Sequence, residues 1–412
     1  MSARRASLLF DSISENTGDM AIGLASAQAL NDRGVVSKVM DPFTPGLQRP
    51  LIVGGGDLIR AKGDPFYDLF RPRGNNILNA AGVWSKADDL GYLTDYAFVS
   101  ARSTREAEYL RKWVPEADVV PCSTTLLRSD HFAIPGLTAG EPVVGIQLVP
   151  HSMRLIEDLV PIINSIPHKK VFIPFTHYNA DASFMNTLPF NRNNCIFLDR
   201  LDPLELHSVV GQMSQIVASS LHISIFAYSQ NVPFVSIRQE KIHNYFQDRG
   251  LAEHVAETGS ELKQILERLN SEHFDFSAEI VADRAAVEFA FDRYVEILTK
   301  DDGGEWGLNP PKATSSVQRD TLIHSQSSEV LADRDITLGI VEGRRLAALT
   351  RENLQAAELE QVRNENIALA REVDDLRGAI DVLHRTSGQR IKRLLRHPLQ
   401  TVRNRISTYR NP

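Results

Sequence analysis

The sequence has few cysteines and no segment typical of a secreted or membrane-spanning chain. Only Cys122 and Cys195 occur among 412 residues, and neither belongs to a C-x-x-C pair. We therefore expect no disulfide framework, no metal site and a reducing, cytoplasmic environment. The first apolar run stops at Phe10, too early for the core of a signal peptide. Residues 208–237 lack Asp, Glu, Lys and Arg, but glutamines, serines and Pro233 interrupt them, which predicts buried α/β structure rather than a membrane helix.

Acidic residues are missing from the C-terminal segment, whereas they dominate the rest of the chain. Residues 385–412 hold eight Lys and Arg and no acid, which leaves the first 384 residues with a net charge of −15. An acidic body does not favour nucleic acid as a partner. The tail also carries an apolar face, so we expect a peripheral contact of 385–412 with an anionic membrane at its cytoplasmic side. A solvated basic tail is the alternative.

Short apolar runs alternate with amphipathic stretches through the first 300 residues. This alternation predicts strands separated by helices, and hence parallel sheets of the α/β class. A loop rich in Gly and Pro at 131–142 divides the pattern into two halves. We predict two Rossmann-like domains that face a cleft, followed by a helical, coiled-coil extension. The boundaries that we expect are 1–140 and 141–300 for the two domains, 301–340 for a linker, 341–384 for the helix and 385–412 for the tail.

A heptad pattern lies within the predicted C-terminal helix. Apolar residues and one asparagine recur at alternating spacings of three and four from Leu359 to Leu383, with Asn366 at an a position. Such a seam favours a parallel two-stranded coil, in which the buried asparagine pairs with its copy. The sequence therefore predicts a homodimer through 359–383. An amphipathic helix docked on the body is the alternative.

Polar and glycine residues follow several predicted strands, where ligands bind in parallel α/β sheets. Neither G-x-G-x-x-G nor a P-loop occurs, so nicotinamide and ATP chemistry have no motif support and we expect no cofactor. Helix capping, tight turns and a satisfied core histidine are the structural alternatives for these sites. The candidate residues are Asn16, Gly18 and Asp19; Gly54, Gly55 and Gly56; His177 and Asp181; and Ser219, Ser220 and His222.

Several stretches together resemble the polysaccharide pyruvyl transferase family. They are "NTGDMAI", "IVGGGDLI", "VSARSTREAEYL", "IPFTHYNAD" and "SSLHISIFAYSQNVPFVSIRQEKIHNYFQDRGL", and they span about residues 5–255. The resemblance implies a GT-B-like fold and the transfer of a pyruvyl group from phosphoenolpyruvate, as co-substrate, to two hydroxyls of a sugar or glycan acceptor, which forms a ketal. It implies that His222 is the general acid and that Arg102, Lys241, Ser219 and Ser220 contact the donor.

The sequence departs from the family pattern in three places. The serine downstream of Arg102 is replaced, and the acidic residue expected near Pro121–Ser123 is missing. In addition, Ser220 stands where the family has an arginine before Leu-His. A serine hydroxyl cannot replace the charged fork of a guanidinium group. Two alternatives to pyruvyl transfer therefore stay open. The first is a GT-B-like glycosyltransferase with a nucleotide-sugar donor, whose diphosphate can bind at backbone N–H groups and helix ends. The second is a catalytically degenerate, dimeric scaffold.

Overall fold

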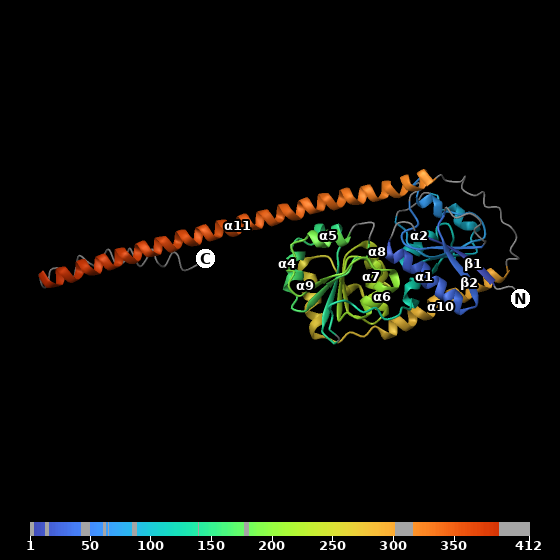
Figure 1. Cartoon of the computed structure of the whole chain (residues 1–412), viewed down its shortest axis with the longest axis horizontal. Coiled ribbons are helices and arrows are strands. Elements are labelled where there is room, and N and C mark those ends of the chain that lie inside the picture. Colours follow the sequence, from blue (N-terminus) through green and yellow to red (C-terminus); the bar gives the residue numbers. More distant parts are fainter. Residues whose placement is uncertain are drawn as a thin grey trace. The chain divides into compact units, whose positions relative to one another are not determined.

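The computed structural model describes residues 4–12, 16–42, 50–60, 63–64, 66–84, 89–138, 140–176, 181–300 and 316–386. Its contacts divide the chain into two units, Met1–Val341 and Glu342–Pro412. The first unit holds two parallel sheets of six strands each, with helices around them (Figure 1). The second unit holds the larger part of one long helix. The α/β class and the helical C-terminal region predicted from the sequence are confirmed.

The first sheet has the strand order β2-β1-β3-β4-β5-β6, and every pair in it is parallel. Its order reverses at β1, which has β2 on one side and β3 on the other. In such a sheet, the crevice at the carboxyl ends of the two strands beside the reversal is the usual place for a ligand. The strands are β1 (Arg4–Phe10), β2 (Val35–Met40), β3 (Leu51–Gly54), β4 (Ile77–Ala81), β5 (Phe98–Ala101) and β6 (Asp118–Val119).

The second sheet has the order β12-β11-β10-β7-β8-β9 and is also parallel throughout. Counted from its own first strand, this is the 3-2-1-4-5-6 order of dinucleotide-binding Rossmann folds. The order reverses between β7 and β10. The strands are β7 (Val143–Gln147), β8 (Lys169–Phe172), β9 (Cys195–Phe197), β10 (Gln215–Ala218), β11 (Phe234–Ile237) and β12 (Val255–Ala256).

The helices begin where the sequence supplies caps. At the start of α6, the Asp202 carboxylate accepts hydrogen bonds from the backbone of Leu204 and Glu205, and Pro203 occupies the first helical position. The helices of the first unit are α1 (Thr17–Asp32), α2 (Thr104–Leu110), α3 (Pro150–Leu155), α4 (Leu159–Ser165), α5 (Asp181–Thr187), α6 (Pro203–Gly211), α7 (Leu221–Ser229), α8 (Glu240–Gln247), α9 (Gly259–Ser271) and α10 (Ser277–Lys300).

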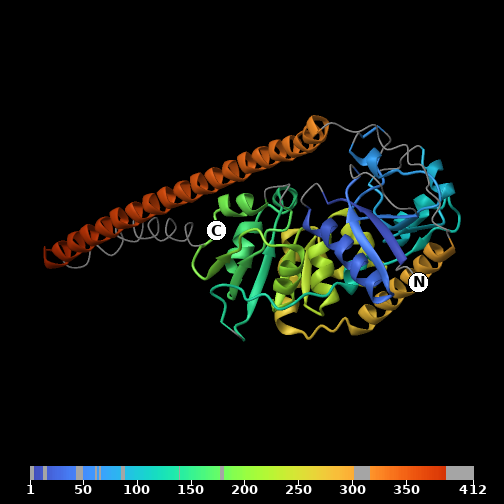
Figure 2. The ribbon, with the colours of Figure 1, turned by 45° about the vertical axis from the view of Figure 1, so that its right-hand side comes forward.

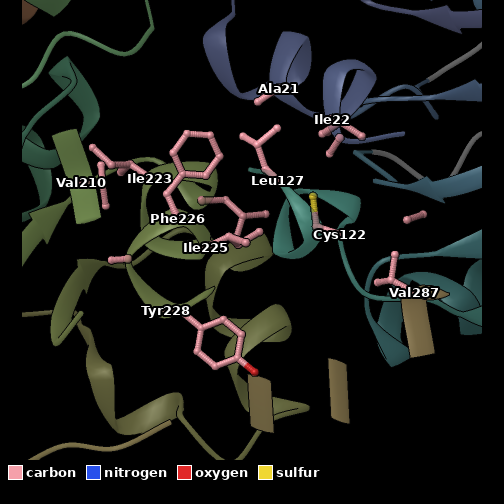
Figure 3. Packing of buried hydrophobic residues seen from close by; sticks show 14 of the residues in the cluster. Ala21, Ile22, Cys122, Leu127, Val210, Ile223, Ile225, Phe226, Tyr228 and Val287 are labelled. Carbon is pink, nitrogen blue, oxygen red and sulfur yellow. The ribbon is translucent and has the colours of Figure 1, made fainter. Parts of the chain in front are cut away.

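One hydrophobic cluster joins the two sheets. It contains Ile22 of α1, Leu127 after the first sheet and Phe226 of α7, all of them buried. Figure 3 shows these side chains packed against one another across the boundary between the domains. The helix α10 follows the second sheet in sequence but contacts α1, β1 and the short helix η3 (Ser123–Leu126) of the first half (Figure 2). The two domains therefore share a core.

The long helix α11 (Ser316–Thr386) includes the segment 341–384 that was predicted to be helical and begins inside the segment 301–340. Near its start, Leu338 and Val341 pack against the core of the second domain. The basic tail predicted at 385–412 lies outside the described residues, apart from residues 385 and 386, which end α11. In the described part of the chain, no helix is long and apolar enough to cross a membrane.

Candidate active site

Residues that follow β1 and β3 of the first sheet meet residues that follow β10 of the second. Asp19 lies in the first turn of α1, and His222 lies in the first turn of α7. Their side chains are only 9% and 7% exposed, and 3.8 Å separates Asp19 Oδ1 from His222 Nδ1. The two points at which strand order reverses therefore come together around one buried acid and one buried imidazole.

Two glycine positions allow this close approach. A Cβ on Gly18 would overlap the His222 ring, and a Cβ on Gly56 would overlap the Asp19 carboxyl group. Gly55 and Gly56 also have φ angles of +100° and +59°, which side chains other than hydrogen disfavour. The glycines at Gly18 and in the loop after β3 are thus required by the packing of the site.

Asp19 and His222 are both held in their uncharged forms. Burial raises the pKa of Asp19 to about 8, and the nearby carboxylates of Asp11 and Asp57 add to this effect, whereas Lys241 and Arg102 oppose it. Burial lowers the pKa of His222 to about 3, and the cations of Arg102 and Lys241 lower it further. At neutral pH the pair is consequently a protonated carboxyl group beside a neutral imidazole.

Part of this pair has no partner among the described residues. Asp19 Oδ1 and His222 Nε2 are buried and make no hydrogen bond there. The other carboxyl oxygen of Asp19 accepts a hydrogen bond of 2.9 Å from the Asn16 side chain, whose oxygen in turn caps α1 at Gly18 N. Buried polar atoms without partners are costly, and they mark this place as one built to receive a ligand or a proton.

A second cluster of charges lies beside the pair. Asp57, which follows the glycine loop, forms ion pairs with Arg102 from the end of β5 and with Lys241 from α8, the latter at 2.9 Å. Arg102 also pairs with Glu106 at 3.0 Å. Although burial opposes it, the cations of Lys241 and Arg102 hold the pKa of Asp57 well below its usual range. Two cations and two carboxylates therefore form a network that is neutral as a whole.

The serines before His222 are held through their backbones. Gln147, at the end of β7, accepts hydrogen bonds from the backbone N–H groups of Ser219 (3.1 Å) and Ser220 (3.0 Å). The Ser219 hydroxyl is hydrogen-bonded to Ser152. Ser220 occupies the N-cap position of α7, but its side chain makes no capping hydrogen bond. Its hydroxyl is partly exposed and is available to a ligand beside His222.

Asp181 holds the loop after β8. Its Oδ2 accepts hydrogen bonds from the backbone N–H groups of Phe175 (2.7 Å) and Thr176 (2.8 Å). Thr176 forms an isolated bridge with Asn16, which brings this loop to the start of α1. Asp181 thus holds the backbone of a loop that contacts the start of α1. His177 lies outside the described residues.

The structure brings together most of the predicted residues and adds three that were not predicted. The predicted residues that form or surround the Asp19–His222 pair and the adjoining ion pairs are Asn16, Gly18, Asp19, the loop 54–56, Arg102, Ser219, Ser220, His222 and Lys241. The additional residues are Asp57, Glu106 and Gln147. Asp57 stands directly after the three glycines, and this position was the available signal. Glu106 ends the pattern Ser103-x-x-Glu106, which is typical of a helix start, but neither this pattern nor the position of Gln147 indicates a contact with the site.

The family model of polysaccharide pyruvyl transferase matches residues 16–240, from the cap of α1 to the start of α8. This match includes both halves of the site and more than half of the chain. The chain belongs to the polysaccharide pyruvyl transferase family. Its membership supports a transferase that acts in polysaccharide modification. No curated protein sequence matches the chain.

Several solved structures have a similar chain trace at low sequence identity. The S. aureus MnaA–UDP complex has 11% identity and a TM-score of 0.43, over 74% of this chain and 100% of its own. A Methanocaldococcus jannaschii UDP-GlcNAc 2-epimerase with UDP-GlcNAc and UDP has 11% identity and a TM-score of 0.43, over 72% and 99%. The E. coli ADP-heptose heptosyltransferase II has 12% identity and a TM-score of 0.37, over 65% and 98%.

Metal ligands do not cluster in the described part of the chain. No group of three or more His, Cys, Asp or Glu side chains in those ranges has a geometry that could hold a metal ion. The carboxylates of the site instead pair with Arg102 and Lys241.

Proposed function

We propose that this protein transfers the pyruvyl group of phosphoenolpyruvate to a sugar of a polysaccharide or lipid-linked glycan and forms a cyclic ketal. The family match supports the reaction class. The observation that carries the proposal is the buried Asp19–His222 pair beside the cations Arg102 and Lys241. It combines a group that can donate a proton with groups that can bind an anion.

The reaction requires one proton at carbon and the departure of one phosphate. The methylene carbon of phosphoenolpyruvate takes a proton, so that the central carbon becomes electrophilic and a sugar hydroxyl attacks it. The C–O bond to phosphate breaks, and a second hydroxyl of the same sugar closes the ketal. Of the two hydroxyl protons released, one replaces the proton given to the methyl group and the other leaves with hydrogen phosphate.

His222 is the proposed donor of the proton to carbon, with Asp19 as its source. The imidazole is neutral in the unliganded site because its pKa is about 3. A bound trianion favours the imidazolium form and so raises this pKa. Asp19 keeps its proton up to about pH 8 and lies 3.8 Å from the ring. A general acid with a pKa tuned toward neutrality suits this step.

The proposed anion contacts are Arg102 and Lys241, with the Ser220 hydroxyl beside them, because the backbone N–H groups of Ser219 and Ser220 already donate to Gln147. Both cations are already paired with Asp57, so a donor shares them with this carboxylate. Serine replaces the family arginine at position 220, which removes a third cation. The site is therefore expected to bind phosphoenolpyruvate less tightly than a site with an unshared arginine fork.

Trp84 is the proposed contact for the acceptor sugar. It lies beyond the carboxyl end of β4, and 61% of it is exposed. The Lys241 ammonium group lies 5.7 Å from its ring centroid and the Arg60 guanidinium 5.0 Å. An exposed indole ring beside a reactive centre can stack on the apolar face of a sugar. Trp84→Ala should raise the KM for the glycan about tenfold and leave the KM for phosphoenolpyruvate unchanged, and Trp84→Phe should retain most of the affinity.

The proposed location is the cytoplasm, with the tail 385–412 in contact with an anionic membrane. Its eight Lys and Arg support this, since each basic residue near such a surface contributes about 1 kcal/mol. Full-length protein should sediment with vesicles that contain phosphatidylserine and not with neutral vesicles. A chain that ends at Arg385 should lose this binding, and retention by the shortened chain would refute the proposal.

The direct test is incubation of the purified protein with phosphoenolpyruvate and extracted lipid-linked glycans. The expected products are phosphate and a glycan that carries a pyruvate ketal, detected by mass spectrometry. His222→Asn should lower turnover roughly 10²–10⁴-fold while the protein stays folded. If neither product forms with any glycan of a broad set, pyruvyl transfer is wrong.

A nucleotide-sugar donor is the second candidate, and the charge balance of the site favours it. The network of Asp57, Arg102, Glu106 and Lys241 is neutral as a whole, which provides no excess positive charge for a trianion. A diphosphate can instead bind at backbone N–H groups of a helix start. A rise in melting temperature with UDP or GDP sugars, together with none for phosphoenolpyruvate, would favour this function.

A further inference from the structure

The helix α11 carries an apolar stripe along one face, of which Leu369, Val373 and Leu376 are half-buried and the earlier apolar residues are exposed. Leu359 is 71% exposed and Val362 38% exposed. The stripe continues through Asn366, Leu369 and Val373 to Leu376, at alternating spacings of three and four residues. Apolar side chains repeated along one helical face are rarely left in water, so this stripe requires a covering surface.

We propose that the same stripe of a second copy of this chain covers it, in a parallel, two-stranded and in-register coiled coil. From Asn366 onward the residue types favour two strands, whereas Leu359 at a and Val362 at d do not. Val373 lies at an a position, and Leu369 and Leu376 lie at d positions, when Leu359 is taken as an a position. β-branched residues at a with leucine at d favour two parallel strands over three or four. The proposal is independent of the reaction that the first unit catalyses.

The charges that flank the stripe give the orientation. In a parallel coil, each g residue faces the e residue of the next heptad on the other chain. This register places Glu358 opposite Arg363 and Glu372 opposite Arg377, which are two attractive pairs per chain. Glu365 faces Ala370, so no pair among these joins like charges. All of these charged side chains are exposed and so available to a second copy.

An antiparallel coil would place g residues opposite g residues and e residues opposite e residues. Glu358, Glu365 and Glu372 would then face one another, as would Arg363 and Arg377, and like charges would repel. Asn366 supports the same conclusion, since an asparagine at one a position is satisfied by its own copy only when the two helices are parallel and in register. Charge and polarity thus agree on one arrangement.

Arg377 has a competing partner within its own chain. Its guanidinium lies 3.4 Å from Asp374, one turn earlier. Both side chains are about three-quarters exposed, at 76% and 75%, and exposed pairs of this kind are weak. Arg377 can therefore leave Asp374 and pair with Glu372 of the second copy at little cost in free energy. The ion pair within the chain does not prevent the dimer.

The register is tested with single cysteines in the full chain, with Cys195→Ser to remove the partly exposed native thiol; Cys122 is buried. Under mild oxidation, Asn366→Cys should give a disulfide-linked dimer, because a positions of the two copies face each other. Arg371→Cys is the matched control at an f position on the outer side of the coil and should give none. Equal cross-linking of the two variants would overturn the register.

The orientation is tested by sedimentation velocity with charge reversal. Glu372→Arg should raise the dimer dissociation constant roughly tenfold, since arginine then faces Arg377. The double variant Glu372→Arg with Arg377→Glu should restore it. In an antiparallel coil the single reversal would strengthen the dimer instead.

Two further results would also overturn the proposal. One is a full chain that sediments as a monomer at about 100 μM, a concentration at which coils of micromolar affinity are dimeric. The other is a Leu369→Asp variant that dimerises as well as the original chain. Circular dichroism of each variant shows whether α11 is still helical, and the melting temperature shows whether the first unit is still folded.

Discussion

Asp19 and His222 are both ionisable, yet the folded protein holds both without charge at neutral pH. Burial is the main cause in each case, and it shifts the two pKa values in opposite directions. The proton of this pair therefore resides on the Asp19 carboxyl group, and not on the His222 imidazole, until an anion binds. Pairs of groups whose surroundings separate their pKa values in this way are typical of acid–base sites. The acid–base role of His222 therefore depends on Asp19 beside it.

Asp19→Asn tests this protonation state through stability. The folded-state pKa of Asp19 is about 8, above the reference value of 3.8, so folding keeps the proton and stability falls as pH rises from about 4 to 8. His222, with a folded pKa of about 3 against 6.5, makes stability rise over pH 3 to 6.5. Above pH 6.5 only the Asp19 effect remains.

The original protein should melt lower at pH 8 than at pH 6.5, and this fall should be smaller in the variant. Asparagine keeps the shape of the protonated acid and cannot ionise. Asp283→Asn is a control for the loss of a buried carboxyl group elsewhere. If both Asp19→Asn and the original protein show the same fall between these pH values, the raised pKa of Asp19 is wrong.

Asp57→Asn tests whether this carboxylate limits anion binding. Removal of its charge leaves Arg102 paired with Glu106 alone and leaves Lys241 without its partner at 2.9 Å. The empty variant should be less stable, since breaking a buried ion pair costs about 3–5 kcal/mol. Its half-saturating phosphoenolpyruvate concentration should nevertheless fall, about tenfold.

The matched control is Asp283→Asn, which breaks the buried pair of Asp283 with Arg249 (2.6 Å) outside the site. It should lower the melting temperature and leave donor affinity unchanged. Weaker donor binding by Asp57→Asn would show that Asp57 orients the cations productively rather than competing with the donor for them.

The sequence was sufficient to find residues that lie directly after strands, because position relative to a strand is a local property. Asp19 and His222 were found in this way, and so was the glycine loop at 54–56. Glu106 was not found, since its role depends on Arg102 one helical turn away and on the fold of the loop at 82–83. The shifted pKa values could not be predicted either, because burial arises only when the two domains meet.

At the scale of elements, the approach of α1 to α7 defines the site. The backbone of Gly18 in α1 lies against the ring of His222 in α7, and a Cβ there would overlap it. The φ angle of Gly18 is not positive, so backbone conformation is not the reason for glycine. An alanine would by itself favour the helix by about 0.5–1 kcal/mol. Steric exclusion by His222 is the reason.

Gly18→Ala should therefore lower both turnover and melting temperature, because the His222 ring must move. Gly23→Ala in the same helix is the control, since its Cβ would lie 3.2 Å from Val39, without overlap and away from His222, and should have a smaller effect. In a His222→Ala background, Gly18→Ala should become neutral or stabilising. An equal loss of stability in both backgrounds would show that the two residues are not coupled.

The strand pattern allowed the α/β class and two successive parallel halves to be predicted, whereas the order of strands was not predictable from it. Alternation of apolar and amphipathic runs indicates parallel strands but not which strands are neighbours. The return of α10 to the first half was also hidden, because its apolar face would suit either sheet. Contacts of α10 with α1, β1 and η3 are long-range and have no local sequence signal.

At the scale of the whole molecule, the shared core decides how the first unit unfolds. One cluster includes Phe10 and Ile22 from the first half, Phe226 and Tyr228 from α7, and Tyr294 of α10. The Tyr294 hydroxyl also donates a hydrogen bond of 3.0 Å to Asn79 of β4. A domain that lost its partner would expose this apolar surface to water at a cost of about 25 cal/mol per Å². The two sheets should therefore not unfold separately.

Calorimetry of the first unit should accordingly show one cooperative transition, with equal calorimetric and van't Hoff enthalpies. Phe226→Ala, a buried change in the second half, should cost about 3–5 kcal/mol. It should lower the midpoint reported by probes in both halves by the same amount, because the cluster belongs to both. A chain that ends at Val341 should melt like the full chain, since it keeps Leu338 and Val341, which pack against this unit. Two separate transitions, or a lower midpoint in the second half alone, would show that the two domains are energetically independent. In that case the Asp19–His222 site could open without unfolding either sheet.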